Sequence, residues 1–170
     1  TIYRVADDSQ VLSALINAAK NGKEVTAVLE LRARFDEAHN IKWSKQLQDE
    51  GVQVIFGVPG LKVHSKIGIV EREPQRGAAE KYAFVSTGNF HEGTARGYTD
   101  FTLFTANENI VEQVDDVFSF FNANYLVKHY KDIAVSPWGI RRKLIVGIQR
   151  EIKNKKLGLP AQINIKVNSL

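Results

Sequence analysis

The sequence contains no cysteine and no methionine. Without cysteine there is no disulfide framework and no thiolate metal site, which fits a reducing compartment, so we expect a cytoplasmic location, with peripheral membrane attachment left open for a longer chain. Because translation starts with methionine, its absence at Thr1 predicts a piece of a longer protein. No stretch approaches the roughly 18 uninterrupted apolar residues of a membrane span, and the first residues carry no signal-peptide pattern.

Charge is mildly positive, and the remaining composition is that of an ordinary globular domain. Of the 170 residues, 44% are hydrophobic and 25% charged, which fits one domain with a proper core. The net charge of +4 favours anionic ligands such as phosphates, nucleotides or nucleic acid. Local basic clusters occur at 141–143 and 153–156, where a solvated helix face is the simpler interpretation.

Hydrophobic periodicity predicts helices alternating with strands. The expected helices are 9–19, 39–50, 107–123 and 137–156, and the expected strands 24–31, 52–56, 62–70, 82–86, 100–105 and 163–170. The helix 107–123 should carry on its inner face Ile110, Val111, Val114, Val117, Phe118 and Phe121. Alternating strands and helices indicate an α/β fold, with a mixed sheet sandwiched between helices, and the lack of a linker predicts a single domain over 1–170.

The first motif that carries chemistry is His64-Ser65-Lys66. In a strand, His64 and Lys66 point to one face, because side chains alternate with period two. An imidazole beside an ammonium makes an anion site that contains a nucleophile, and the lysine favours the neutral, attacking imidazole. For this tripeptide alone, a half-exposed pair on a strand edge is the simpler interpretation.

The second motif, Ser86 to Glu92, directly follows an expected strand. Its small residues bring backbone N–H groups, together with the side chains of Thr87 and Asn89, close to an anion. The alternative is an ordinary strand-to-helix turn. In that turn we expect His91 to be a helix-entry residue rather than a catalytic one, and His39 and His129 to be surface residues.

Together the two motifs resemble the half-site of the phospholipase D superfamily. That pattern has His-x-Lys, an aspartate after four further residues, and then Gly-Ser-x-Asn, whereas here Glu71 holds the acidic position and Thr87-Gly88-Asn89 forms the turn. These departures argue against an ordinary phosphodiesterase.

The sequence resembles one branch, the bacterial polyphosphate kinases of the histidine-phosphorylating type, over essentially its whole length. The resemblance is to their first C-terminal catalytic domain, a phospholipase D-like half-domain. The matching stretches are IYRVA at 2–6, ARFDE at 33–37, GVPGLKVHSK at 57–66, TGNFHEGTAR at 87–96, YTDF at 98–101 and VSP at 135–137.

The resemblance implies a role for individual residues. His64 matches the phosphohistidine, and Lys66 and Asn89 complete the half-site. Arg4 and Arg34 match arginines associated with a magnesium-phosphate site, where guanidinium groups would bind phosphate oxygens near Mg²⁺ rather than the metal itself. The direct Mg²⁺ ligands stay open, and a surface ion pair is the alternative for each arginine.

Tyr98 matches a position that contacts the nucleotide, by stacking or through its hydroxyl, with a core tyrosine as the alternative. The implied reaction is reversible transfer of the terminal phosphate of ATP to inorganic polyphosphate, with ADP as the other product. The implied partners are the remaining domains of the same polypeptide, including a second histidine half-site, and further copies in a homo-oligomer. We therefore expect the isolated chain to fold but to have little or no kinase activity.

Two other functions stay open at this point. One is a phospholipase D-type nuclease or lipid hydrolase, against which the missing aspartate and the two arginines argue. The other is a nucleic-acid-binding module that uses the basic helix 137–156, which lacks interleaved exposed aromatic residues.

Overall fold

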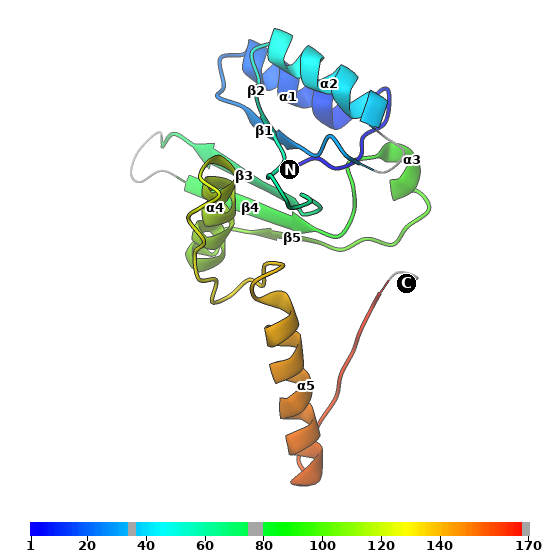
Figure 1. Ribbon diagram of the computed structural model, residues 1–170, viewed down its shortest axis with the longest axis vertical. Helices are drawn as coiled ribbons and strands as arrows, with labels where there is room; N and C mark the ends of the chain where they lie inside the picture. Colours follow the sequence, from blue (N-terminus) through cyan, green and yellow to red (C-terminus); the bar gives the residue numbers. More distant parts are fainter. Residues whose placement is uncertain (34–36, 75–79, 168–170) are drawn as a thin grey trace. The chain divides into compact units, whose positions relative to one another are not determined.

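The computed structural model describes residues 1–33, 37–74 and 80–167 (Figure 1). The chain forms two compact units, Thr1–Lys128 and His129–Leu170, which are described separately. The expectation of a single domain over 1–170 stays a prediction. No helix among the described residues is long and apolar enough to cross a membrane.

The first unit contains both parallel and antiparallel strand pairs. Strands β1 (Thr26–Leu29) and β2 (Gln53–Phe56) pair in parallel. Strands β3 (Lys66–Arg72), β4 (Glu80–Ser86) and β5 (Thr102–Thr105) form an antiparallel sheet in the order β3-β4-β5. The mixed α/β architecture expected from the alternating pattern is confirmed.

The first residues of the chain lie between the two sheets. The backbone N–H of Ile2 donates to the Val28 carbonyl at 2.7 Å. On the other side, the Thr1 hydroxyl donates to the Ser65 carbonyl at 2.6 Å and accepts from the Ile67 N–H at 3.1 Å. Residues 1–4 are therefore held beside the segment that leads into β3.

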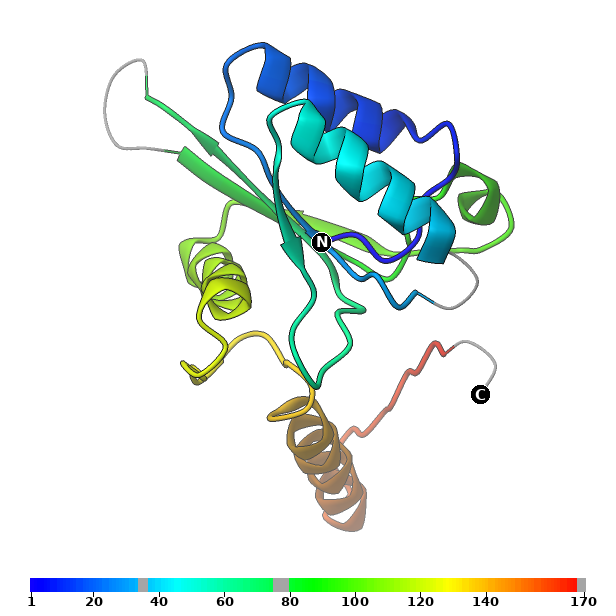
Figure 2. The same cartoon turned by 45° about the horizontal axis from the view of Figure 1, so that its top comes forward.

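Helices cover the strands on both sides, as Figures 1 and 2 show for this unit. Helices α1 (Gln10–Lys20) and α2 (Glu37–Asp49) lie together, and Ser9 caps α1 by accepting from the Leu12 N–H. Their core consists of Ile2, Val5, Leu12, Ile16, Ala27, Leu29, Trp43, Leu47 and Val52. Burial of each such large side chain stabilises the fold by about 1.5–3 kcal/mol.

Helix α4 (Glu108–Asn122) closes the second core, whose buried members are Val28, Val58, Val63 and Phe120. Val111, Val114 and Val117 are buried as expected. Phe118 and Phe121 lie on the inner face as expected, where they pack against this core partly buried, but the prediction missed the buried Phe120. The buried row follows every third residue, so it drifts around the helix away from the predicted face.

Strand β3 begins at Lys66 and not at residue 62, so the prediction that His64 lies within a strand was wrong. Between β2 and β3 the chain turns through a short bridge between Val58 and Leu61. The N–H of Val63 donates to the Glu30 carboxylate at 2.9 Å instead of to a neighbouring strand. In this segment the Glu30 side chain therefore takes the place of a hydrogen bond to a neighbouring strand.

The second unit contains α5 (Ile140–Lys156), which has no buried residue. It begins three residues after Pro137, because residues 136–139 form a turn. The strand expected at 163–170 is absent over its described part, residues 163–167, where no strand pairs with it. Lys143 is not simply solvated, since its ammonium donates to the carbonyls of Lys131 and Ile133.

Candidate functional site

His64 and Lys66 contact each other although only Lys66 belongs to β3. The Lys66 ammonium lies 3.1 Å from Nδ1 and 3.3 Å from Nε2 of His64, and it donates to the His64 carbonyl at 2.7 Å. Lys66 is only 3% exposed, whereas His64 is exposed. The site thus places an accessible imidazole over a buried cation.

Tyr3 forms the wall of this site, a role that the sequence analysis missed. Its buried ring meets the His64 ring edge-on, with centroids 4.4 Å apart. The cationic groups of Lys66, Arg4 and Lys62 lie 5.4, 5.6 and 5.9 Å from the Tyr3 ring centroid. An aromatic face attracts cations, so it helps to hold several like charges near one another. The sequence holds two signals for this role: Tyr3 directly precedes Arg4, and Lys62 lies two residues before His64.

These charges set the protonation of the site. Partial burial first, and then the positive charges of Lys66, Arg4 and Lys62, lower the pKa of His64. Burial lowers the pKa of Lys66 to about 8, with a further lowering by Arg4 and an opposing effect of Asp100. A neutral imidazole surrounded by cations can attack an electrophilic phosphorus atom while the cations bind its oxygens.

The turn after β4 is tied to Asp100, which the sequence analysis did not single out. The Thr87 hydroxyl donates to Asp100 Oδ1 at 2.9 Å and accepts from the Phe101 N–H at 3.1 Å. A Cβ atom on Gly88 would lie 2.6 Å from Asp100 Oδ2, so any larger residue would push the Asp100 side chain away. Asp100 thereby stands near enough to Lys66 to favour its charged form.

Asn89 and His91 lie in the same turn. Oδ1 of Asn89 is buried and has no hydrogen-bond partner among the described residues, so it can accept a donor from a ligand. His91 caps the short helix α3 (Glu92–Ala95), because its ring accepts from the Thr94 N–H at 3.3 Å. Its expected place at the helix entry is confirmed.

Among the described residues, no contact with His64 is found for Tyr98, Glu71 or His39. Tyr98 is 57% exposed, and in the described part of the chain its side chain makes no ring contact or hydrogen bond. Arg34 lies outside the described residues. Glu71, at the acidic position of the superfamily pattern, pairs with Lys81 at 3.3 Å across the β3-β4 hairpin. His39 lies on the surface, with its Nε2 3.3 Å from Oδ1 of Asp7.

Residues 1–127 match the model of the family "Polyphosphate kinase C-terminal domain 1". The chain belongs to this family. It is 47% identical to the polyphosphate kinases of Escherichia coli (strain K12) and Vibrio vulnificus (strain YJ016) over 169 residues, 99% of the chain and 24% of each relative. The crystal structure of polyphosphate kinase from Porphyromonas gingivalis matches with a TM-score of 0.76 and 38% identity, over 92% of this chain and 26% of that one. The chain therefore spans about a quarter of the length of these relatives.

The donor set of this polyphosphate kinase domain suits phosphate better than a metal ion. Among the described residues, no group of three or more histidine, cysteine, aspartate or glutamate side chains could hold a metal. The side chains around His64 are cations, which bind phosphate oxygens and repel Mg²⁺. They do not fit direct coordination of Mg²⁺, which would have to arrive with the phosphates.

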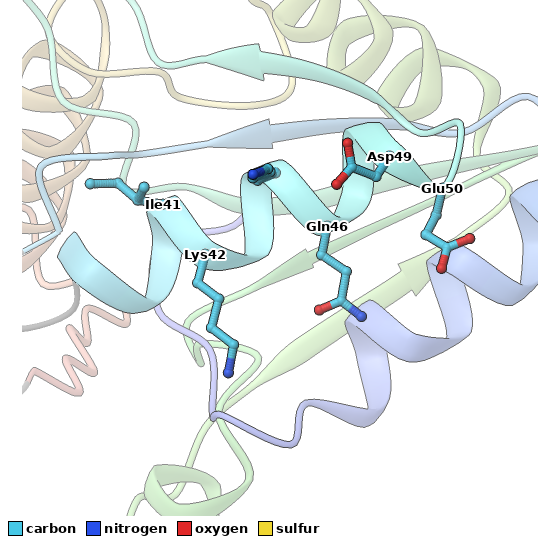
Figure 3. Close-up of a pocket in the computed structure, with 6 residues that line it drawn as sticks. Ile41, Lys42, Gln46, Asp49 and Glu50 are labelled. Atoms are coloured by element: carbon cyan, nitrogen blue, oxygen red, sulfur yellow. The ribbon is translucent and has the colours of Figure 1, made fainter.

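A hollow on the outer surface of α2 is unrelated to His64 (Figure 3). Its volume is about 350 Å³, and its lining consists of Ile41, Lys42, Lys45, Gln46, Asp49 and Glu50. The lining mixes both signs of charge, and it comes from one helix and the residue that follows it. The hollow therefore offers no arrangement comparable to the imidazole and the buried ammonium of His64 and Lys66.

Proposed function

We propose that this chain supplies the phosphohistidine half-site of a polyphosphate kinase, in which His64 takes the terminal phosphate of ATP and passes it reversibly to inorganic polyphosphate. The observation that carries this proposal is the contact between His64 and the buried Lys66, with the pKa of His64 lowered. The imidazole is then neutral near pH 7 and has a lone pair for attack.

In the first step a ring nitrogen of His64 forms an N–P bond with the γ-phosphorus of ATP. The bond from that phosphorus to the bridging oxygen breaks, and ADP leaves with the electron pair. The other ring nitrogen gives up its proton to solvent, because His64 is exposed. In the second step a terminal oxygen of polyphosphate attacks the phosphorus, the N–P bond breaks with its electron pair left on the ring, and a proton from solvent restores the neutral imidazole.

The basic side chains stabilise the transferring group. Lys66 contacts the imidazole and Arg4 lies near enough to lower its pKa, and they bind the equatorial oxygens on which charge is spread in the transition state. Arg34 is assigned to the same group of oxygens. Asn89 offers its buried, unsatisfied oxygen to a donor, and the exposed ring of Tyr98 is free to stack on the nucleotide base.

Mg²⁺ bound to the nucleotide phosphates neutralises part of their charge. The described residues do not fit direct coordination of Mg²⁺, so the ion would come to the site with the nucleotide. The remaining three quarters of a relative's length leave room for a second histidine half-site and further domains, and for assembly into a homo-oligomer. We infer that 1–170 is one catalytic half-domain, with little or no kinase turnover alone.

The test is intact-mass and phosphohistidine analysis after incubation with ATP or polyphosphate and Mg²⁺. An acid-labile phosphate should form on the wild type and on His91→Ala, whose histidine caps α3, and not on His64→Ala. Label that survives in His64→Ala would contradict the assignment. So would the absence of label on every variant, both in this chain and in a polypeptide of the relatives' full length. Hydrolysis of a phosphodiester dye would favour a phosphodiesterase instead.

A further inference from the structure

We propose that Glu30 is a positioning residue for His64: its buried carboxylate fixes the backbone of the segment from which the imidazole projects. The inference rests on the proposed function only in taking His64 as the reacting group. Glu30 directly follows β1 and is 6% exposed.

Both oxygens of this carboxylate are occupied by backbone N–H groups from separate segments. Oε2 accepts from Val63 at 2.9 Å, and Oε1 accepts from Arg32 at 3.0 Å. Val63 is the residue before His64, and Arg32 begins the segment that leads toward the sequence-predicted Arg34. One carboxylate therefore connects the segment of the nucleophile to the end of β1.

The backbone of Glu30 holds the other wall of the site. Its N–H donates to the Ile2 carbonyl at 3.0 Å. Its carbonyl accepts from Nδ2 of Asn40 at 2.8 Å, and the same Nδ2 donates to the Tyr3 carbonyl at 2.9 Å. The backbone of Tyr3, whose ring lies against His64, is thus linked through Asn40 to Glu30, the residue that also binds the Val63 N–H.

A side chain has to bind the Val63 N–H because the segment before β3 has no strand partner. Residues 62–65 form no ladder, so the Val63 N–H would be a buried orphan without Glu30. The carboxylate also lies close to the turn after β2. An added Cβ at Gly57, whose φ is +50°, would be 3.6 Å from Glu30 Oε2.

Glu30 serves neither as an ion-pair partner nor as a base in this arrangement. Among the described residues it has no salt bridge, and its oxygens face backbone donors rather than the imidazole. A glutamine has one acceptor oxygen and one donor nitrogen, so in Glu30→Gln one of the two N–H groups would meet another donor. The variant keeps the volume of the side chain and removes one positioning contact.

The experiment is NMR of the chain with Glu30→Gln, read at the His64 ring and at the Val63 amide. We expect the His64 ring signals and pKa to change, because the ring moves relative to Tyr3 and Lys66, and the Val63 amide to exchange about tenfold faster or more. Where the wild type is labelled by ATP, the labelling rate should fall about 10- to 100-fold, as for a nucleophile displaced by about 1 Å.

Two controls separate positioning from general destabilisation. Glu50→Gln makes the same chemical change in the ion pair with Lys20 and should leave all His64 signals unchanged. Leu47→Ala opens the core of α2 and lowers stability, and it should still leave the His64 ring shifts and pKa at their wild-type values.

Wild-type shifts and pKa at His64 in Glu30→Gln would overturn the proposal, whatever the labelling shows. A wild type that is never labelled would count against the proposed function alone, since the NMR readout does not need turnover. If Glu30→Gln does not fold, the same His64 shifts and pKa are measured in Glu30→Asp, which shortens the side chain and keeps the carboxylate. Wild-type values in that variant would likewise overturn the proposal. In the wild type, a scalar coupling across the hydrogen bond from the Val63 nitrogen to the Glu30 carboxylate carbon is expected, and its absence would also overturn the proposal.

Discussion

The ammonium of Lys66 lies 3.1 Å from Nδ1 of His64 and at the same time donates to the carbonyl of that histidine at 2.7 Å. One buried cation thus contacts both the ring and the backbone of the nucleophile assigned here. Because of this contact, the charge of Lys66 affects the pKa of His64. The effect can be tested without any substrate.

Removal of the Lys66 charge should raise the pKa of His64. A positive neighbour disfavours the imidazolium, so in Lys66→Met the His64 pKa should move up toward its ordinary value near 6.5. An NMR titration of the ring protons measures this. Lys62→Met, which removes the smallest of the contributing charges, should give a smaller rise. Equal pKa values in the wild type and Lys66→Met would refute the assigned electrostatics.

Phosphorylation of His64 should follow a bell-shaped pH profile. The rate should rise with pH through the lowered pKa of His64, because the neutral ring attacks, and fall above about 8 as Lys66 loses its proton. Initial labelling rates against pH measure both limbs. In Lys66→Met the fall above about pH 8 should disappear, and its persistence would assign that limb to another group.

Lys66 should also cost stability at neutral pH. Its pKa is about 8 in the folded chain and near 10.5 when unfolded, so below pH 8 the folded state carries a charge that burial disfavours. Lys66→Met should therefore raise the free energy of unfolding by about 1–3 kcal/mol at pH 7. The wild type should gain stability between pH 8 and 10.5, and the difference should shrink there. Denaturant titrations at several pH values test this, and a variant less stable at pH 7 would contradict it.

Asn40 should be among the most sensitive polar positions. It is fully buried, and its Nδ2 serves the carbonyls of Tyr3 and Glu30. Asn40→Ala leaves two buried carbonyls without their donor and should lower the free energy of unfolding by about 2–4 kcal/mol. The exposed Asn17→Ala should change it by no more than about 0.5 kcal/mol. Similar values for the two variants in chemical denaturation would be the contrary result.

Two glycines should respond to alanine in opposite directions. A Cβ at Gly68 would lie 2.2 Å from Cε1 of Phe84 on the paired strand, so Gly68→Ala should destabilise the first unit by about 1–3 kcal/mol. Gly147 lies within α5 with nothing within 4 Å of an added Cβ, and Gly147→Ala should stabilise that helix by up to about 1 kcal/mol. Thermal unfolding followed by circular dichroism distinguishes the two, and a loss of stability in Gly147→Ala would be the wrong sign.

Local patterns were sufficient for most of the elements. Apolar spacing located α1, α2 and α4 to within two residues at each end, and the cap at Ser9 follows from a polar residue before an apolar run. The predictions failed where strand formation depends on a partner strand. The segment around His64 looks like a strand but donates to Glu30, and residues 163–167 have strand-like composition without a partner. Strand pairing depends on what lies alongside, which is not a local property.

The sequence by itself determined the α/β class, the family, and the pair His64 and Lys66, because these depend on the order of residues along the chain. Only the tertiary structure decided that Tyr3 and Asp100 join this pair, and that Glu30 holds the segment before it. These residues come from distant parts of the chain. Packing of the sheets, and the need of each buried N–H and carbonyl for a partner, brings them to one place.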